Sequence, residues 1–322
     1  MSPYSLTDLP QQVLLPEYES AVDALKDHIS AQPGFVSFYS IGGVSAPGIS
    51  DLDVLVVWED GTFHKADLRP LHSVFGKYLF IHSLYGTTPG LFKEALHFTC
   101  YAPSRLLAGQ QLHVTTETTV IDPTVRRQIS IEYLLRLFVG LHLQHLQGML
   151  RVRSILLNAN GISSDLAVLF PGNQDAARMM NGLARLRSEW FSGTPPLNEF
   201  RDWFSDFHPW IGSALTSLLD AKELHLPENK SYRLGRNIRL EQSDRTSFPS
   251  SFFQLPFIRP FVGRRYPNML NRLNRPVFRM PYASFDHPEP MRAYFDFTRR
   301  HREYNRMYLP AYLPLTGSLQ LT

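Results

Sequence analysis

The sequence predicts a mixed α+β fold, in which a small mixed β-sheet domain is followed by a helical domain with an extended, proline- and arginine-rich arm. The first part of the chain alternates short β-prone runs with helical patterns, and the middle part carries long amphipathic helical patterns. The last part has eight prolines between Ser243 and Pro290, a density that prevents long regular elements. The expected domains are residues 1–122, residues 123–229, and an arm with a C-terminal helix over residues 230–322.

The bulk composition is that of a folded protein. The chain has 322 residues, of which 43% are hydrophobic and 19% charged, so two domains are a natural expectation. Its single cysteine, Cys100, cannot form an internal disulfide. Met1–Pro16 lacks the basic and apolar segments of a signal peptide, and no apolar run is long enough to span a membrane. We therefore expect a soluble cytoplasmic protein with no membrane partner.

Charge is distributed unevenly along the chain. Residues 1–122 carry 6 Lys/Arg and 13 Asp/Glu, whereas residues 230–309 carry 16 Lys/Arg and 6 Asp/Glu. The two parts could pack against each other with complementary charge. Alternatively, the acidic part could hold metal and the basic part could bind a polyanion such as nucleic acid.

Hydrophobic periodicity predicts the individual elements. Strands are expected over residues 35–41, 54–58 and 77–85. Helices are expected over residues 17–29, 67–75, 91–97, 124–157, 174–191, 198–220 and 289–308.

One stretch combines a glycine turn with paired acids. Gly42 and Gly43 follow the first β-prone run, and Asp51 and Asp53 open the next one. Because side chains two residues apart in a strand share a face, the two carboxylates should lie side by side. Such a pair is unfavourable unless a positive group lies between them. Glycine turns offer backbone N–H groups to phosphate, so the stretch indicates a divalent cation that bridges protein and phosphate.

The ordered combination of Gly42-Gly43, a short gap, Asp51-Leu-Asp53 and an apolar strand resembles the signature of the polymerase-β-type nucleotidyltransferase superfamily. The resemblance covers about the first third of the chain. It implies Mg²⁺-dependent transfer of a nucleoside monophosphate from a nucleoside triphosphate to an unknown acceptor, which could be a small molecule, a protein or RNA. It implies Asp51 and Asp53 as catalytic metal ligands, and Gly42, Gly43 and Ser45 as the nucleotide-binding pocket.

The chain departs from this signature at the third carboxylate, which the family normally supplies from a following strand. That strand should be Lys77–Tyr85, which has His82 and Ser83 where an acid is expected. His82 could act as a catalytic base, since imidazole titrates near neutral pH. A substitute acid could instead come from elsewhere, the candidates being Glu94, Glu117 and Asp122.

Three readings of function stay open on the sequence. The first is an active nucleotidyltransferase. The second is a catalytically degenerate nucleotide- or partner-binding protein of the same fold. The third is a nucleic-acid-binding protein that uses the basic C-terminal region. His142 and His145 are three residues apart on a predicted helix, but no further ligand completes a metal set, so we expect ordinary surface or helix-packing histidines.

Overall fold

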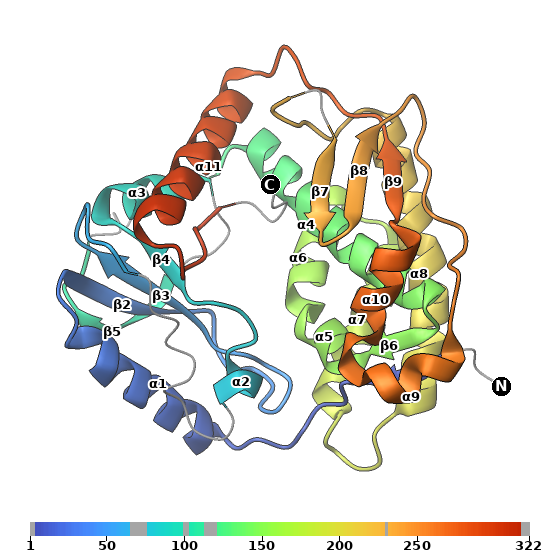
Figure 1. Cartoon of the computed structure of the whole chain (residues 1–322), viewed down its shortest axis with the longest axis horizontal. Coiled ribbons are helices and arrows are strands. Elements are labelled where there is room, and N and C mark those ends of the chain that lie inside the picture. Colours follow the sequence, from blue (N-terminus) through green and yellow to red (C-terminus); the bar gives the residue numbers. More distant parts are fainter. Residues whose placement is uncertain (1–3, 65–75, 99–102, 113–120, 229–230, 317–322) are drawn as a thin grey trace. The chain divides into compact units, whose positions relative to one another are not determined.

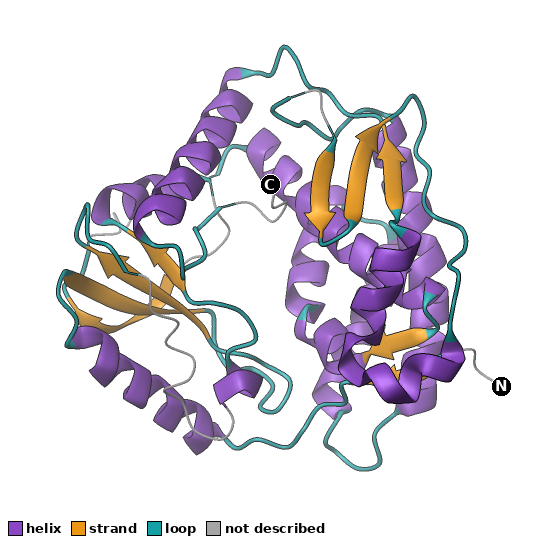
Figure 2. Ribbon diagram, viewed as in Figure 1, coloured by secondary structure: helices purple, strands orange, loops and turns teal. Residues whose placement is uncertain are grey.

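The computed structural model describes residues 4–64, 76–98, 103–112, 121–228 and 231–316 (Figures 1 and 2). The chain divides into two compact units. The sheet unit consists of Pro10–Arg126 and Glu289–Gly317, and the helical unit of Met1–Leu9, Arg127–Pro288 and Ser318–Thr322. Each unit is therefore built from segments that are far apart in the sequence.

A four-stranded mixed sheet forms the centre of the sheet unit. Its strands are β2 (Phe35–Ile41), β3 (Asp53–Trp58), β4 (Tyr85–Thr87) and β5 (Pro103–Gly109). They lie in the order β4-β3-β2-β5, with β2 antiparallel to β3 and β5, and β4 parallel to β3. Ile41 is paired with Asp53, so the end of β2 lies beside the start of β3.

Helices cover both faces of this sheet (Figure 1). On one face, α1 (Leu15–Ser30) packs Leu25 and Ile29 against the alternate residues Val54 and Val56 of β3. The Glu17 carboxylate accepts a hydrogen bond from the Leu14 backbone N–H at 2.6 Å and so stabilises the start of this helix. On the other face lie α3 (Pro89–Ala95) and α11 (Glu289–Tyr308), and a short helix, α2 (Gly76–Leu79), precedes β4.

The far end of the chain completes the sheet unit. The Leu313 N–H donates to the Leu84 carbonyl at 2.8 Å, and the Gly86 N–H donates to the Leu313 carbonyl at 2.9 Å. Phe297 of α11 and Leu315 belong to the same apolar core as Leu55 of β3. The core around the sheet is therefore completed by residues that follow the helical unit in the sequence.

Among its described elements, the helical unit contains seven α-helices and two small sheets. The first five helices are α4 (Pro123–Leu146, which begins in the sheet unit), α5 (Val152–Leu157), α6 (Ala159–Leu169), α7 (Gln174–Glu189) and α8 (Leu197–Asp220). The smaller sheet pairs β1 (Ser5–Thr7) with β6 (Met149–Arg151) in parallel. The larger sheet has the order β7-β8-β9, formed by β7 (Tyr232–Gly235), β8 (Ile238–Gln242) and β9 (Val277–Met280).

Between β8 and β9 lie a 3₁₀ turn (Pro256–Ile258), α9 (Arg259–Val262), a second 3₁₀ turn (Gly263–Arg265) and α10 (Tyr266–Asn274).

The mixed α+β class is confirmed, but two predicted elements are wrong. Most of the predicted strand 77–85 is not a strand: its start belongs to the helix α2, and strand pairing begins only at Tyr85. The reason is that the side chains of Leu79 and Phe80 are both buried in the apolar core, which an alternating strand would not allow. The predicted helix 124–157 ends at Leu146, where Gly148 has a φ of +62° that reverses the chain into β6.

The extended arm is not confirmed. The described part of residues 230–288 forms the three-stranded sheet and short helices, of which α10 is the longest at nine residues. The predicted helix over residues 67–75 lies outside the described residues. None of the helices among the described residues carries an apolar stretch of membrane-spanning length.

Replacing Gly86 by Ala should destabilise the protein. A Cβ atom at Gly86 would lie 2.6 Å from the Cβ of Tyr312, so the segment after α11 would have to shift. We expect the free energy of unfolding to fall by roughly 1–3 kcal/mol in urea denaturation. The matched control is Gly90→Ala in α3, where an added Cβ meets nothing within 4 Å. Equal effects of the two changes would contradict this packing.

Stability should also fall in mild acid through His301, which is fully buried in α11. Burial lowers the pKa of His301 from 6.5 to about 4, although the Gly86 and Leu315 carbonyls act in the opposite direction. In this pH range the unfolded chain therefore binds a proton at His301 and the folded chain does not. The free energy of unfolding falls as the pH drops from about 6.5 towards 4.

Urea unfolding of the wild type and of His301→Asn at about pH 7.5 and about pH 5 isolates this contribution. The wild type should lose about 2 kcal/mol more than the variant between the two conditions, at about 1.4 kcal/mol per pH unit. Identical losses would show that His301 is not held neutral by burial.

Candidate metal centre

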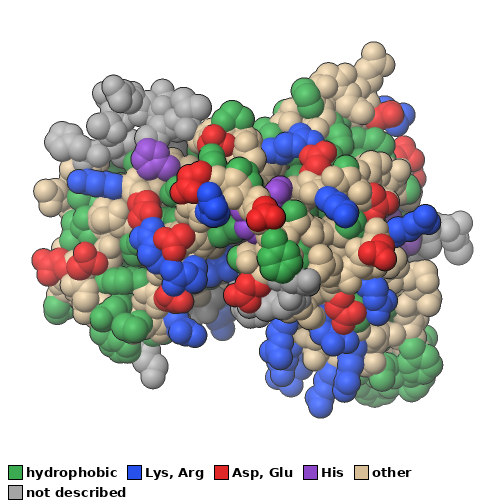
Figure 3. Space-filling view, turned by 90° about the horizontal axis from the view of Figure 1, so that it is seen from above, with side chains coloured by type: hydrophobic (Ala, Val, Ile, Leu, Met, Phe, Trp, Pro, Cys, Tyr) green, Lys and Arg blue, Asp and Glu red, His purple; other side chains and the backbone are tan. Residues whose placement is uncertain are grey.

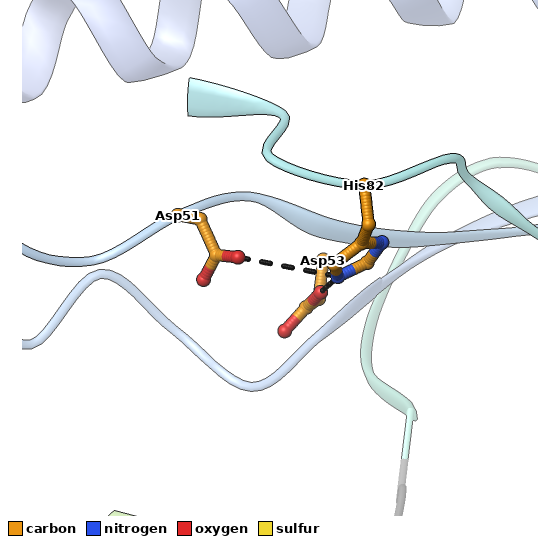
Figure 4. A group of neighbouring side chains, drawn as sticks. All are labelled: Asp51, Asp53 and His82. Carbon is orange, nitrogen blue, oxygen red and sulfur yellow. Dashed lines mark ion pairs between the residues drawn. The ribbon is translucent and has the colours of Figure 1, made fainter. Parts of the chain in front are cut away.

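Three side chains converge at the start of β3 (Figure 4). Asp51 lies just before the strand, Asp53 is its first residue, and His82 comes from the segment between α2 and β4. The Leu52 N–H donates to the Leu79 carbonyl at 2.8 Å, which fixes the two segments beside each other. One ligand atom from each of the three side chains lies within 4.8 Å of the others, and no other such group of three His, Cys, Asp or Glu occurs among the described residues.

His82 faces both carboxylates. Its Nε2 lies 2.7 Å from Oδ1 of Asp53 and 4.0 Å from Oδ2 of Asp51. About 31% of the His82 and Asp53 side chains is exposed, and about 11% of Asp51. The group is therefore open to solvent on one side, so an ion or a phosphate can reach it.

The other ring nitrogen of His82 is already engaged. Nδ1 lies 2.7 Å from the Ser83 carbonyl, which can only accept a hydrogen bond, so Nδ1 carries a proton. This leaves Nε2 as the nitrogen that can either bind a second proton or donate its lone pair to a metal. Metal-binding histidines commonly hydrogen-bond a backbone carbonyl through their other nitrogen in this way.

In the metal-free protein His82 is readily protonated. Burial lowers the pKa of His82, but the contacts with Asp53, the Ser83 carbonyl and Asp51 outweigh burial and raise the pKa above its usual 6.5. Protonated His82 can thus ion-pair with the two carboxylates in place of a metal. Either a proton on His82 or a bound cation can offset the negative charge of the two carboxylates.

Asp53 carries the feature that most favours a cation. Its Oδ1 is buried and has no aligned hydrogen bond within the described residues, although Nε2 of His82 is only 2.7 Å away. The contact is close in distance but poor in hydrogen-bond geometry, and an unsatisfied buried carboxylate oxygen is costly. Two carboxylates and one imidazole are a donor set that fits a divalent transition metal, because Mg²⁺ prefers oxygen ligands alone.

The glycine turn lies next to this centre in the fold. Gly42, with a φ of +67°, follows the end of β2, whose last residue pairs with Asp53. Gly42, Gly43 and Ser45 are all exposed, and a Cβ at either glycine would meet nothing within 4 Å. The turn is therefore accessible to a ligand, although the Ser45 N–H donates to the Gly43 carbonyl at 3.1 Å.

Two tyrosines hold the loop between the turn and the acids. The Tyr18 hydroxyl donates to the Ser50 carbonyl at 2.8 Å and accepts from the Gly48 N–H at 2.9 Å. The Tyr78 hydroxyl donates to the Gly48 carbonyl at 2.5 Å. Neither residue was expected at the site. For Tyr18 the sequence did contain a signal, because a tyrosine in the apolar stripe of α1 is buried and its hydroxyl then needs a hydrogen-bond partner.

The substitute acids do not join the centre. Glu94 is bound by Arg300 of α11 through both carboxylate oxygens, one of them at 3.1 Å. Asp122 accepts a hydrogen bond from the Thr124 N–H at 2.8 Å at the start of α4. Glu117 lies outside the described residues. Among the described candidates, only His82 lies within a few ångströms of the carboxylates.

The other predicted histidines pack in the helical unit. His142 Nδ1 lies 3.1 Å from His208 Nε2, and the His145 ring is stacked on His208 with centroids 4.2 Å apart. Burial is the largest of the causes that lower the pKa values of all three, that of His208 to about 3. Of the surface and helix-packing alternatives expected for His142 and His145, the structure shows packing.

Comparison with protein-family models, with curated proteins and with solved structures finds no match for this chain. The functional assignment therefore rests on the chemistry of the site.

Metal binding should discriminate between ions. We expect one Mn²⁺ per chain by isothermal titration calorimetry, bound roughly tenfold more tightly than Mg²⁺ because His82 contributes a nitrogen ligand. His82→Asp should reverse this preference towards Mg²⁺, since it makes the donor set all oxygen. Asp53→Asn should weaken Mn²⁺ binding by about tenfold or more.

The control is Asp23→Asn, an exposed acid of α1 that pairs with Lys26. It should leave both affinities unchanged. The same Mn²⁺ affinity in Asp53→Asn as in the wild type would show that the ion binds elsewhere.

Proposed function

We propose that this protein is a metal-dependent nucleotidyltransferase, with its active site at Asp51, Asp53 and His82. The observation that carries the proposal is the convergence of these three side chains beside an exposed glycine turn at the end of β2. The arrangement supports the resemblance to polymerase-β-type nucleotidyltransferases, in which a glycine turn and an acid pair occupy adjoining strands.

Each part of the site has a role in this proposal. Asp51 and Asp53 hold the divalent cation, which when bound neutralises the triphosphate and stabilises the charge of the leaving group. Gly42 and Gly43 let the triphosphate approach the backbone closely, because they carry no side chain. His82 takes the place of the expected third carboxylate.

The reaction is an exchange of one phosphorus–oxygen bond for another. The acceptor hydroxyl oxygen attacks the α-phosphorus, the bond to the β-phosphate oxygen breaks, and pyrophosphate leaves. The acceptor proton has to be removed during this step. A carboxylate oxygen of Asp51 or Asp53 would accept it if Nε2 of His82 were a ligand, and His82 itself would accept it only if Nε2 were neither a ligand nor already protonated.

One observation favours the rival reading of a catalytically degenerate nucleotide-binding protein. No third carboxylate reaches the centre among the described residues, because Glu94 pairs with Arg300 and Asp122 binds backbone at the start of α4. A site with fewer negative ligands can still bind a metal–nucleotide complex while it turns over slowly. Binding and turnover must therefore be measured separately.

The test combines nucleotide binding with transfer. We expect each nucleoside triphosphate that binds to do so only with Mn²⁺ or Mg²⁺ present, and the α-³²P label to appear on an acceptor from fractionated small molecules, protein or RNA. Asp53→Asn should lower label transfer on the order of 10²-fold, and Asp23→Asn should not. Metal-dependent binding without transfer to any acceptor class would support the degenerate reading. Failure to bind any nucleotide with metal would contradict both readings.

A further inference from the structure

A group of exposed apolar side chains lies between β8 and β9 of the helical unit. Phe261 of α9 is 88% exposed, Phe257 is 69% exposed and Phe253 is 62% exposed, and Leu273 of α10 is half exposed. Large apolar side chains gathered on a surface in this way mark interaction sites. We call these residues, together with the four nearby arginines, the Phe–Arg surface; the arginines are Arg259, Arg265, Arg272 and Arg275.

Local structure fixes these side chains in two pairs, Phe257 with Phe261 and Phe253 with Leu273. Phe257 and Phe261 are four residues apart in consecutive helical turns, so they share a face. The Phe253 N–H donates to the Asn274 side chain at 2.7 Å, and that side chain donates back to the Phe253 carbonyl at 3.0 Å. Phe253 is thereby fixed at the end of α10, next to Leu273.

The exposed rings are not needed for the local core. Ile258 and Val262 point inward and pack against Met149, Tyr266 and Leu270. The local apolar core is therefore packed by Ile258 and Val262, which adjoin the phenylalanines in the sequence. The outward phenylalanines remain available to an outside partner.

The charged residues of the segment that carries these rings have one sign. Residues 245–285 contain seven arginines, no lysine and no acidic residue. Arg265, Arg272 and Arg275 form no ion pair within the described residues, whereas the exposed Arg178 and Arg185 pair with acids on their own helix. Figure 3 shows Lys and Arg side chains gathered at the lower edge of the helical unit, beside apolar side chains.

We propose that the Phe–Arg surface binds peripherally to a membrane that contains anionic phospholipid. Phenylalanine rings that protrude this far can enter the boundary between head groups and acyl chains. Arginine guanidinium groups match the geometry of lipid phosphates and are attracted to a negative surface.

The exposure of the rings favours a lipid surface over a nucleic acid. A stacked base covers one face of a ring, but Phe261, at 88% exposure, presents both faces and its edge to water. Insertion removes all of that surface from water, and it also covers Leu273, which cannot stack on a base. The expectation of no membrane partner was based on the lack of a spanning run, which peripheral binding does not require. The proposal is independent of the nucleotidyltransferase assignment.

The test is co-sedimentation of the full chain with large unilamellar vesicles at low and high salt. The protein should bind vesicles of phosphatidylcholine with phosphatidylserine, bind weakly to phosphatidylcholine alone, and lose affinity as salt increases. The double variant Phe257→Ser/Phe261→Ser should bind at least tenfold more weakly. Arg265→Gln/Arg272→Gln should also lose about tenfold or more, because each arginine near an anionic surface contributes about fivefold.

Controls separate the surface from general effects. Phe191→Ser removes a phenylalanine that is 42% exposed elsewhere in the helical unit, and Arg178→Gln removes an arginine that is paired with Asp175. Both should bind like the wild type. Phe261→Trp keeps an apolar ring and should show fluorescence quenched by brominated lipids, which reports insertion without relying on a loss of binding.

Three results would overturn the proposal. They are no binding to anionic vesicles at low salt, equal binding by the wild type and the Phe257→Ser/Phe261→Ser variant, and displacement of bound vesicles by a single-stranded oligonucleotide whose own binding needs the same phenylalanines. The last result would assign the surface to nucleic acid instead.

Discussion

The candidate metal centre is built around two carboxylates that repel each other. Oxygens of Asp51 and Asp53 lie within 4.8 Å, a separation at which two negative charges repel by about 3 kcal/mol at an effective dielectric constant near 20. A positive group has to offset this repulsion, and the fold places one nitrogen, Nε2 of His82, where it faces both acids. Because Nδ1 is committed to the Ser83 carbonyl, Nε2 is the nitrogen that can hold a proton or, as we propose, bind a metal ion.

The surrounding elements hold this centre in place from several parts of the chain. Tyr18 and Tyr78 bind the backbone of the loop that joins the glycine turn to Asp51, and the Leu52–Leu79 hydrogen bond places the His82 segment. The strand β4, which follows His82, pairs with residues near Leu313 from the far end of the chain. Arg300 of α11 binds Glu94, which is one of the acids that could have taken the place of the third carboxylate. The positions of the site residues thus depend on segments that the sequence separates widely.

Much of the centre could be predicted from the sequence, because its signals are local. The glycine pair and the period-two acids are short-range patterns, and the long helices 174–191, 198–220 and 289–308 follow from apolar periodicity. The strand expected over 77–85 could not be excluded, because its apolar residues suit a strand or a buried turn equally. The membership of α11 in the sheet unit could not be predicted either, since an amphipathic helix does not reveal which core it covers. Because Arg300 belongs to α11, the ion pair that keeps Glu94 from serving as a metal ligand could be recognised only once α11 was placed beside α3.

Pulsed electron paramagnetic resonance of the protein loaded with one equivalent of Mn²⁺ tests the central claim most directly. If Asp51, Asp53 and His82 hold the metal, the spectrum should show the coupling of one histidine nitrogen, and His82→Asp should bind Mn²⁺ without that coupling. A histidine coupling that persists in His82→Asp, or its absence from the metal-loaded wild type, would contradict the assignment of this centre.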